Sequence, residues 1–214
     1  NPPNDTVENH WVSLYGDHNR VDHCLLLGKN NQGTTLVVWL DGHPNYHQID
    51  HNYFGPRPEL GRNGGETIRV GTSTWSQTDS YTTVEDNYFE KCDGEIEIIS
   101  NKSCHNIYRH NTFYKCRGTL TLRHGNYARV EENFFFGENE PGTGGIRIIG
   151  SHHTVINNYL QDLTGTDLYA AISVMNTQPH PALNGYWPVD STVIVNNTIV
   201  NCKQGIVIGS GAGE

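Results

Sequence analysis

The sequence predicts an all-β fold: a right-handed, single-stranded parallel β-helix with a stacked Asn ladder and loop insertions. Two repeats lead to this prediction. In the first, an Asn is followed by Tyr, Thr or Phe and then by Phe, Leu or Ile. In the second, a short segment alternates apolar and polar residues and follows most copies of the first. Short strands and turns that recur at a nearly fixed period are typical of a solenoid.

The repeated Asn marks one position in each coil. Its intervals are 35, 24, 22, 25 and 39 residues along Asn52, Asn87, Asn111, Asn133, Asn158 and Asn197. The short intervals fit one coil, and the long ones fit a coil with an inserted loop. Stacked coils lie about 4.8 Å apart, so these side chains should hydrogen-bond from coil to coil. We also expect these Asn residues to adopt the left-handed turn conformation, which Asn tolerates.

The second repeat predicts the strands that carry a functional face. Its copies are residues 66–70, 95–99, 119–123, 145–149, 171–175 and 205–209. In the second copy, Ile96 and Ile98 should face the core, so Glu95 and Glu97 should both point outward. Lys102 should lie in the turn after that strand. On the next two coils, the same outward face should carry Thr119, Thr121, Arg123 and Arg147.

The composition fits an elongated molecule with a thin core. Hydrophobic residues make up 35% of the chain, and the mean hydropathy is −0.58, both low for a globular domain. The 21 aromatic residues argue against disorder. A length of 214 residues suits one domain. We therefore expect residues 1–214 to form one β-helix domain, a portion of a longer helix that is open at one or both ends.

The charge distribution favours an acidic partner at the middle of the chain. The net charge of −9 argues against nucleic-acid binding. From Lys91 to Arg147, however, eight basic residues stand against seven acidic ones, whereas the rest of the chain has six against sixteen. A polyanion would therefore bind the segment from Lys91 to Arg147 and be repelled by the acidic segments on either side of it. No run approaches the roughly 18 apolar residues of a membrane span, so no membrane partner is expected.

The five cysteines indicate packing rather than metal binding or catalysis. No C-x-x-C pair is present, which argues against a zinc site. Cys92, Cys116 and Cys202 each lie five residues after a ladder Asn, so they should share one column.

The repeat gathers charged and amide side chains on one face. Two outward carboxylates, Glu95 and Glu97, and the amide of Asn63 are hard oxygen ligands of the kind that calcium prefers. Ordinary ion pairs between these carboxylates and Arg residues on neighbouring coils are an equally good interpretation of the pattern alone.

Several stretches together resemble polysaccharide lyase family 6, which contains alginate lyases and chondroitinase B. They are Cys-Asp-Gly-Glu-Ile-Glu-Ile-Ile-Ser-Asn-Lys-Ser at 92–103, Leu-Arg-His-Gly at 122–125, Gly-Thr-Gly-Gly-Ile-Arg-Ile at 142–148 and Asn-Gly-Gly-Glu-Thr-Ile-Arg-Val-Gly-Thr-Ser at 63–73. Lys102 follows Glu97 by five residues and precedes Arg123 by twenty-one, a spacing similar to that of the family's catalytic set.

The resemblance implies a calcium-assisted lyase that cleaves an acidic polysaccharide, alginate first, by β-elimination. It implies Lys102 as the base that takes the C5 proton and Arg123 as the residue that assists the leaving 4-O group. It further implies calcium ligands at Asn63, Glu95 and Glu97, and a sugar-binding cleft lined by His124 and Arg147. A uronate polymer is too large to import intact, so a secreted or periplasmic bacterial enzyme is expected.

Two further substrate-binding candidates come from position in the sequence. Arg69, in the outward column, would hold a substrate carboxylate or form an ion pair with Glu95 or Glu66. Tyr186 and its neighbour Trp187 lie in the long insertion after Met175, where they would stack on sugar rings or cover the flank of the helix.

Other functions remain open at this point. A lyase acting on dermatan sulfate fits the same residues. A non-catalytic β-helix, such as an adhesin or a carbohydrate-binding segment, gives no reason for the spacing of Glu97, Lys102 and Arg123. An enzyme like pectate lyase would use an Arg base, which the Lys at position 102 disfavours.

Overall fold

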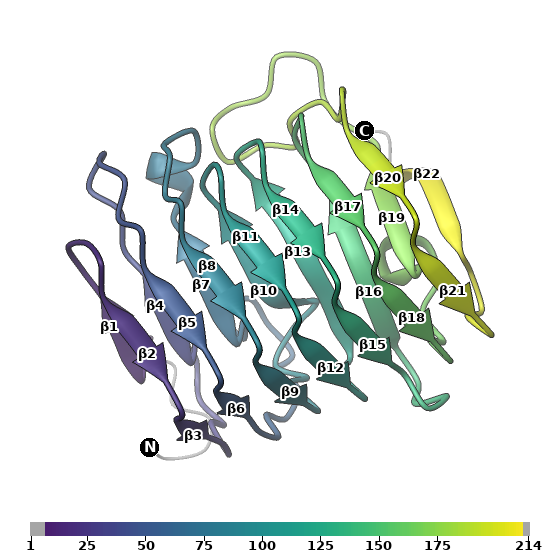
Figure 1. The fold of residues 1–214 in the computed structure, drawn as a ribbon, viewed down its shortest axis with the longest axis horizontal. Coiled ribbons are helices and arrows are strands. Elements are labelled where there is room, and N and C mark those ends of the chain that lie inside the picture. Colours follow the sequence, from purple (N-terminus) through teal and green to yellow (C-terminus); the bar gives the residue numbers. More distant parts are fainter. Residues whose placement is uncertain (1–6, 212–214) are drawn as a thin grey trace.

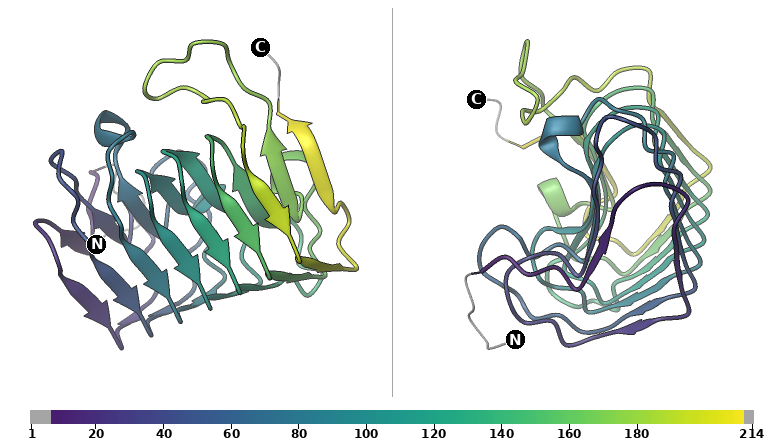
Figure 2. Two further views of the ribbon diagram at one scale, coloured as in Figure 1. Left: turned by 45° about the horizontal axis from the view of Figure 1, so that its top comes forward. Right: turned by 90° about the vertical axis from the view of Figure 1, so that its left-hand side faces the viewer.

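The computed structural model describes residues 7–211 and shows a parallel β-helix, as predicted (Figure 1). Each full coil gives one strand to each of three sheets, which have eight, seven and seven strands among the described residues. Neighbouring strands within every sheet are parallel. Viewed along the long axis, the coils overlie one another (Figure 2).

The bounds of the strands follow the coils. Sheet 1 contains β1 (Val12–Leu14), β4 (Leu36–Val38), β7 (Ile68–Gly71), β10 (Glu97–Lys102), β13 (Gly118–His124), β16 (Thr143–Ile148), β19 (Ile172–Met175) and β22 (Ile206–Ser210). Sheet 2 contains β2 (Arg20–Asp22), β5 (Gln48–Asp50), β8 (Thr83–Glu85), β11 (Ile107–Arg109), β14 (Arg129–Glu131), β17 (Thr154–Ile156) and β20 (Val193–Val195). Sheet 3 contains β3 (Leu25–Leu26), β6 (Tyr53–Phe54), β9 (Tyr88–Glu90), β12 (Thr112–Tyr114), β15 (Phe134–Phe136), β18 (Tyr159–Gln161) and β21 (Thr198–Val200).

Two short 3₁₀ helices interrupt the coils, η1 (Ser73–Trp75) and η2 (Asp167–Tyr169). Within residues 7–211, no helix has the length and apolar character that a membrane crossing requires.

The Asn ladder forms as predicted, between sheets 2 and 3. From Asn52 to Asn158, each ladder Asn donates both its main-chain N–H and its Nδ2 to the Oδ1 of the next, and Asn197 accepts the last pair, at 2.9–3.1 Å. The main-chain N–H of Cys24 extends the ladder by donating to Asn52 Oδ1 at 3.0 Å. The ladder therefore satisfies buried polar groups at one corner of every coil.

The predicted left-handed conformation of the ladder Asn residues is wrong by one position. It belongs to the residue before each of them, with φ between 54° and 58° at His51, Asp86, His110, Glu132, Asn157 and Asn196. The chain makes its sharp bend at this preceding residue. The Asn itself remains free to point its amide into the stack.

The core contains columns of identical residues. The rings of Phe54, Phe89, Phe113 and Phe135 stack with centroids 5.0, 4.7 and 4.5 Å apart. The cysteine column is confirmed: the Sγ atoms of Cys92, Cys116 and Cys202 lie against the carbonyls of Phe54, Phe89 and Leu160. These three residues occupy equivalent positions on β6, β9 and β18 of sheet 3. All five cysteines in the described chain are free thiols.

Two β-bulges of opposite sense shape sheet 1 where β10 meets β13. Glu97 pairs with Thr119 but Ile99 pairs with Leu120, so Ile98 is an extra residue in β10. Asn101 then pairs with Leu122 and Lys102 with His124, so Arg123 is an extra residue in β13. A bulge bends its strand and changes where the neighbouring side chains point.

The first bulge makes the predicted alternation wrong. Ile98 and Ile99 both lie in the core, whereas Ile96 is only half-buried and lines the surface cleft described below. The predicted turn position of Lys102 is also wrong, because Lys102 is the last residue of β10. Pairing of β10 with both neighbours extends to this residue.

Candidate active site

A surface cleft of about 430 Å³ lies over sheet 1 and contains most of the predicted site. It is lined by Asn63, Ser73, Ile96, Glu97, Lys102, Arg123, His124, Arg147, Leu168, Asn184 and Tyr186. Seven of the nine predicted site residues are in this lining. The exceptions are Glu95, which lines an adjacent hollow with Asp93 and Arg117, and Arg69.

The coil register explains why residues far apart in sequence meet here. Lys102 on β10 pairs with His124 on β13, and Thr121 of β13 pairs with Arg147 on β16. Asn63 lies in the segment that leads into β7, which neighbours β10. Consecutive strands of one parallel sheet therefore supply the cleft.

Three carboxylates form a compact cluster beside the cleft, and one of them, Glu97, is in its lining. Glu66, Glu95 and Glu97 each offer an oxygen within 4.8 Å of the others. Glu66 is 2% exposed, and its Oε2 has no hydrogen-bond partner among residues 7–211. A buried oxygen without a donor, facing two further carboxylates, fits a divalent cation with oxygen ligands.

The protonation of the cluster reflects its burial. Burial, and then the charges of Glu66 and Glu97, raise the pKa of Glu95 to about 8. Burial also raises the pKa of Glu66, against the opposing effect of Lys102. Glu95 therefore holds its proton near neutral pH unless a cation replaces it.

Glu66 is a candidate ligand that the sequence prediction missed. Glu66 is the first residue of the repeat segment 66–70, as Glu95 is of the segment 95–99 one coil later. This equivalent position in the repeat could have identified Glu66 as a ligand. Asn63, which was predicted as a ligand, lines the same cleft. The carboxylates that could hold a cation are thus Glu66, Glu95 and Glu97. The Asn63 amide, in the same cleft lining as Glu97, is a further candidate ligand.

Three cations face the carboxylates without forming hydrogen bonds to them. Lys102 Nζ lies 3.9 Å from Glu66 Oε1. Arg123 Nε and Arg147 Nη1 lie 3.8 and 3.9 Å from Glu97 Oε1. At these separations the three cations leave Glu66 Oε1 and Glu97 Oε1 able to accept from, or to ligate, a third group.

Arg69 lies outside the cleft lining. Its guanidinium is 3.6 Å from Glu8 and packs on the ring of Trp39, 5.4 Å from the centroid. Arg69 therefore forms its ion pair with Glu8. The predicted partners were Glu66 and Glu95.

His124 is held as a neutral imidazole. Arg123 Nη1 is 3.3 Å from His124 Nδ1, and a guanidinium can only donate, so Nδ1 accepts and Nε2 carries the proton. Nε2 lies 3.4 Å from the Ser73 hydroxyl. Burial, followed by the charges of Arg123 and Lys102, lowers the pKa of His124 to about 3. His124 can thus donate a hydrogen bond to a sugar without adding charge.

Buried Asn101 supports this end of the cleft from the core side. Its Nδ2 donates to the His124 carbonyl at 2.7 Å, and its Oδ1 accepts from the Tyr108 hydroxyl at 2.7 Å and from Asn106 at 2.8 Å. Asn101 immediately precedes Lys102, so this network fixes the end of β10. Asn101 is therefore a supporting residue without a predicted role.

Arg57 is a second supporting residue that the sequence did not indicate. It is 3% exposed and donates to the main-chain carbonyls of Glu66, Gly33 and Asn31 at 2.6, 2.7 and 3.0 Å. Gly64, beside Asn63, donates its N–H to Glu95 Oε2 at 3.2 Å. Arg57 thereby anchors the segment that carries Asn63 and Glu66.

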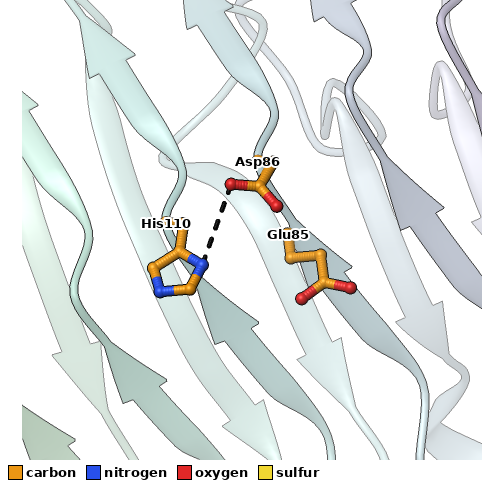
Figure 3. A group of neighbouring side chains, drawn as sticks. All are labelled: Glu85, Asp86 and His110. Atoms are coloured by element: carbon orange, nitrogen blue, oxygen red, sulfur yellow. Dashed lines mark ion pairs between the residues drawn. The ribbon is translucent and has the colours of Figure 1, made fainter.

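A second group of possible metal ligands lies on sheet 2 and is explained by its neighbours. Figure 3 shows Glu85, Asp86 and His110 on adjacent coils, with the imidazole facing Asp86 at 3.7 Å. Glu85 already accepts from Arg109 at 2.6 Å and from Gln48 at 2.9 Å. His110 also contacts Glu132 at 2.7 Å. This group forms a surface ion-pair network.

Comparisons with known proteins agree with these features. The chondroitinase B family model matches residues 1–213. A solved PL6 family alginate lyase, AlyGC, is 50% identical, with a TM-score of 0.96 over 100% of this chain and 30% of its own. None of the curated protein sequences matches the chain.

Two further structures are similar. A mannuronic acid specific family 6 lyase from human gut microbiota is 44% identical, with a TM-score of 0.89 over 96% of this chain and 48% of its own. The alginate lyase AlyF-OU02, solved in complex with G6, is 30% identical, with a TM-score of 0.89 over 95% of this chain and 48% of its own. The chain thus spans from about a third to about half the length of these relatives.

Proposed function

Since the chain belongs to polysaccharide lyase family 6, the family of chondroitinase B, we propose that it carries the cleavage site of an alginate lyase that works by calcium-assisted β-elimination. One observation carries the proposal: Lys102 and Arg123 line one cleft together with Glu97, which belongs to a cluster of three carboxylates. The similar solved structures described as alginate lyases support alginate as the substrate.

The proposed reaction breaks two bonds of a uronate residue. A base takes the proton from C5, and the C–H electron pair forms a double bond between C4 and C5. The C4–O bond breaks, and the departing 4-O oxygen of the neighbouring sugar takes up a proton. The main obstacle is that negative charge develops at C5, beside a carboxylate that is already negative. Stabilising that charge is expected to supply most of the rate enhancement.

Lys102 is the proposed base. A lysine side chain ordinarily loses its proton at a pKa of about 10.4, so a lysine base needs nearby positive charge to stay neutral. Lys102 ends a strand whose position Asn101 fixes, so its amine is presented to the cleft from a rigid element. This placement suits proton abstraction, which requires the base within hydrogen-bond reach of the proton.

A bound calcium ion would neutralise the substrate carboxylate and favour the neutral amine of Lys102. Asn63, Glu66, Glu95 and Glu97 are the proposed ligands. Arg147, buried beside Glu97, would add a second positive charge near the same substrate group.

Arg123 is the proposed partner of the leaving group. A guanidinium hardly deprotonates, so Arg123 donates a hydrogen bond to the departing oxygen while water delivers the proton. His124, neutral and with its proton on Nε2, supplies a further donor for a sugar hydroxyl. Tyr186 closes the lining of the cleft on the side of Arg123.

The test is cleavage of defined polymers by the full-length protein. Alginate, dermatan sulfate and polygalacturonate are incubated separately, and unsaturated ends are followed by ultraviolet absorbance. The expected result is product from alginate, lost on addition of chelator and lost in Lys102→Ala and Arg123→Ala with the fold retained. Product from dermatan sulfate alone would mean that dermatan sulfate, and not alginate, is the substrate. Binding of all three polymers without cleavage would indicate a carbohydrate-binding β-helix.

A secreted or periplasmic location accompanies this proposal, because an intact uronate polymer does not enter the cytoplasm. Fractionation of the source cells tests it: recovery of the protein in the cytoplasm would contradict it.

A further inference from the structure

The long loop between β19 and β20 arches along the edge of the earlier coils (Figures 1 and 2), and its residues 176–190 are called the covering loop here. Several hydrogen bonds tie it to earlier coils. Ser76 Oγ donates to the Leu183 carbonyl at 3.3 Å, and Ser151 Oγ to the Pro188 carbonyl at 2.9 Å. The Gly150 N–H bonds the Trp187 carbonyl at 3.3 Å. The covering loop is therefore held on both sides of residues 184–186.

Residues 184–186 enclose the guanidinium of Arg123. Its Nη1 donates to the Gly185 carbonyl and its Nη2 to the Asn184 carbonyl, both at 3.1 Å. The Tyr186 ring lies against the same guanidinium, 4.4 Å from the centroid to Cζ. Main-chain carbonyls and an aromatic face orient a cation without neutralising it.

The backbone that presents these carbonyls is compact. The Gly185 N–H donates to the Ala182 carbonyl at 2.8 Å, closing a tight turn. A Cβ at Gly185 would lie 2.7 Å from Pro181 Cβ, closer than real side chains approach. Glycine at this position lets the turn aim its carbonyl at Arg123.

We propose that the covering loop is the positioning element for Arg123 and that Tyr186 is its positioning residue, an inference that rests on the proposed function. Arg123 lies at a bulge, where the regular sheet no longer fixes its direction. A long side chain loses much rotamer freedom when it is fixed, and the covering loop does this before substrate arrives. The N–H groups of Arg123 that do not bond Asn184 or Gly185 are then the ones that can donate to the leaving oxygen. Fixing them in advance favours the geometry in which the C4–O bond breaks.

This role differs from the sugar-stacking role predicted for Tyr186. A stacking platform contributes to substrate binding, so its loss raises KM. A positioning residue acts on a group that works in the transition state, so its loss lowers kcat.

The test compares Tyr186→Leu, which removes the ring, with Tyr186→Phe, which keeps the aromatic face. Tyr46→Leu is the matched control, because Tyr46 is exposed and stacks on Tyr81, away from the cleft lining. In the full-length protein, Tyr186→Leu should lower kcat on alginate by roughly tenfold, the scale of a desolvated cation–π contact, with little change in KM. Tyr186→Phe should restore kcat. A raised KM with unchanged kcat would overturn the proposal.

A second readout needs no substrate. In ¹⁵N NMR spectra, the restrained guanidinium of Arg123 should give separate Nη signals, assigned by their loss in Arg123→Ala. Tyr186→Leu should merge them, and Tyr186→Phe and Tyr46→Leu should not. Signals that are merged in the unaltered protein would refute the positioning role. Were the unaltered protein inactive on every polymer, the proposed function would fail, and these spectra would still test whether the loop holds Arg123.

Discussion

The guanidinium of Arg57 donates a 2.6 Å hydrogen bond to the main-chain carbonyl of Glu66, beneath the carboxylate cluster. Within the described chain, the hydrogen bonds of Arg57 go to carbonyls and to the Thr35 hydroxyl, and to no carboxylate. The amine of Lys29 is buried close by, and burial, followed by the charge of Arg57, lowers its pKa to about 8. Arg57 therefore supports the candidate cation site through the backbone.

We predict that Arg57→Lys weakens calcium binding about tenfold, the lower end of what residues supporting metal ligands contribute. A lysine keeps the charge but cannot bridge the carbonyls of Glu66 and Gly33 together. Calcium titration by calorimetry measures the change, and Arg129→Lys, at an exposed position on sheet 2, is the control. Unaltered affinity in a folded Arg57→Lys protein would contradict the supporting role.

Glu66→Gln should reduce calcium affinity roughly tenfold or more, because affinity depends on the number of charged ligands. Glu85→Gln, in the ion-pair network of sheet 2, should leave the affinity as it is. Terbium luminescence in place of calcium gives an independent measurement. Equal affinities of the two variants would remove Glu66 from the ligand set.

Stability without calcium should fall as pH rises across the cluster. Unfolded Glu95 loses its proton near pH 4.5, whereas the folded protein holds it to about pH 8. Between these values the unfolded state binds fewer protons, so the free energy of unfolding decreases with increasing pH. Urea unfolding in chelator from pH 5 to 8 measures this slope. Glu95→Gln should flatten it, and parallel slopes for the two proteins would count against the raised pKa.

Removing a ladder amide should destabilise the fold according to its burial. Asn133→Ala leaves two buried donors of Asn111 without an acceptor, each such loss costing about 1–3 kcal/mol. Asn197→Ala removes the acceptor for the same two groups of Asn158 at a half-exposed rung, where water can replace it. Chemical unfolding should therefore show the larger loss for Asn133→Ala.

The solenoid was predictable because stacking forces equivalent residues into columns. The spacing of Asn87, Asn111 and Asn133 in the sequence is the length of one coil, and it also brings Lys102 and Arg123 to neighbouring strands. The convergence of charged residues in one cleft follows from that register.

The remaining features depend on backbone that has no residue signature. The bulge at Ile98 turned Ile96 out of the core, where strict alternation had placed it. Arg57 and Arg123 are held by main-chain carbonyls, which any residue can present. The contact of Arg69 with Glu8 joins an N-terminal segment whose path the repeat does not describe.

The paired bulges have a consequence for how this protein can change in length. The extra residue at Ile98 in β10 is matched by the extra residue at Arg123 in β13, so both strands advance five residues from the Glu97–Thr119 pair to the Lys102–His124 pair. Deletion of Ile98 alone would shift Lys102 by one residue relative to its partner His124. Deletion of Arg123 alone would shift the pairing by one residue in the opposite direction. Whole coils, which contact only their neighbours, can be gained or lost elsewhere, but here deletions are tolerated only as compensating pairs.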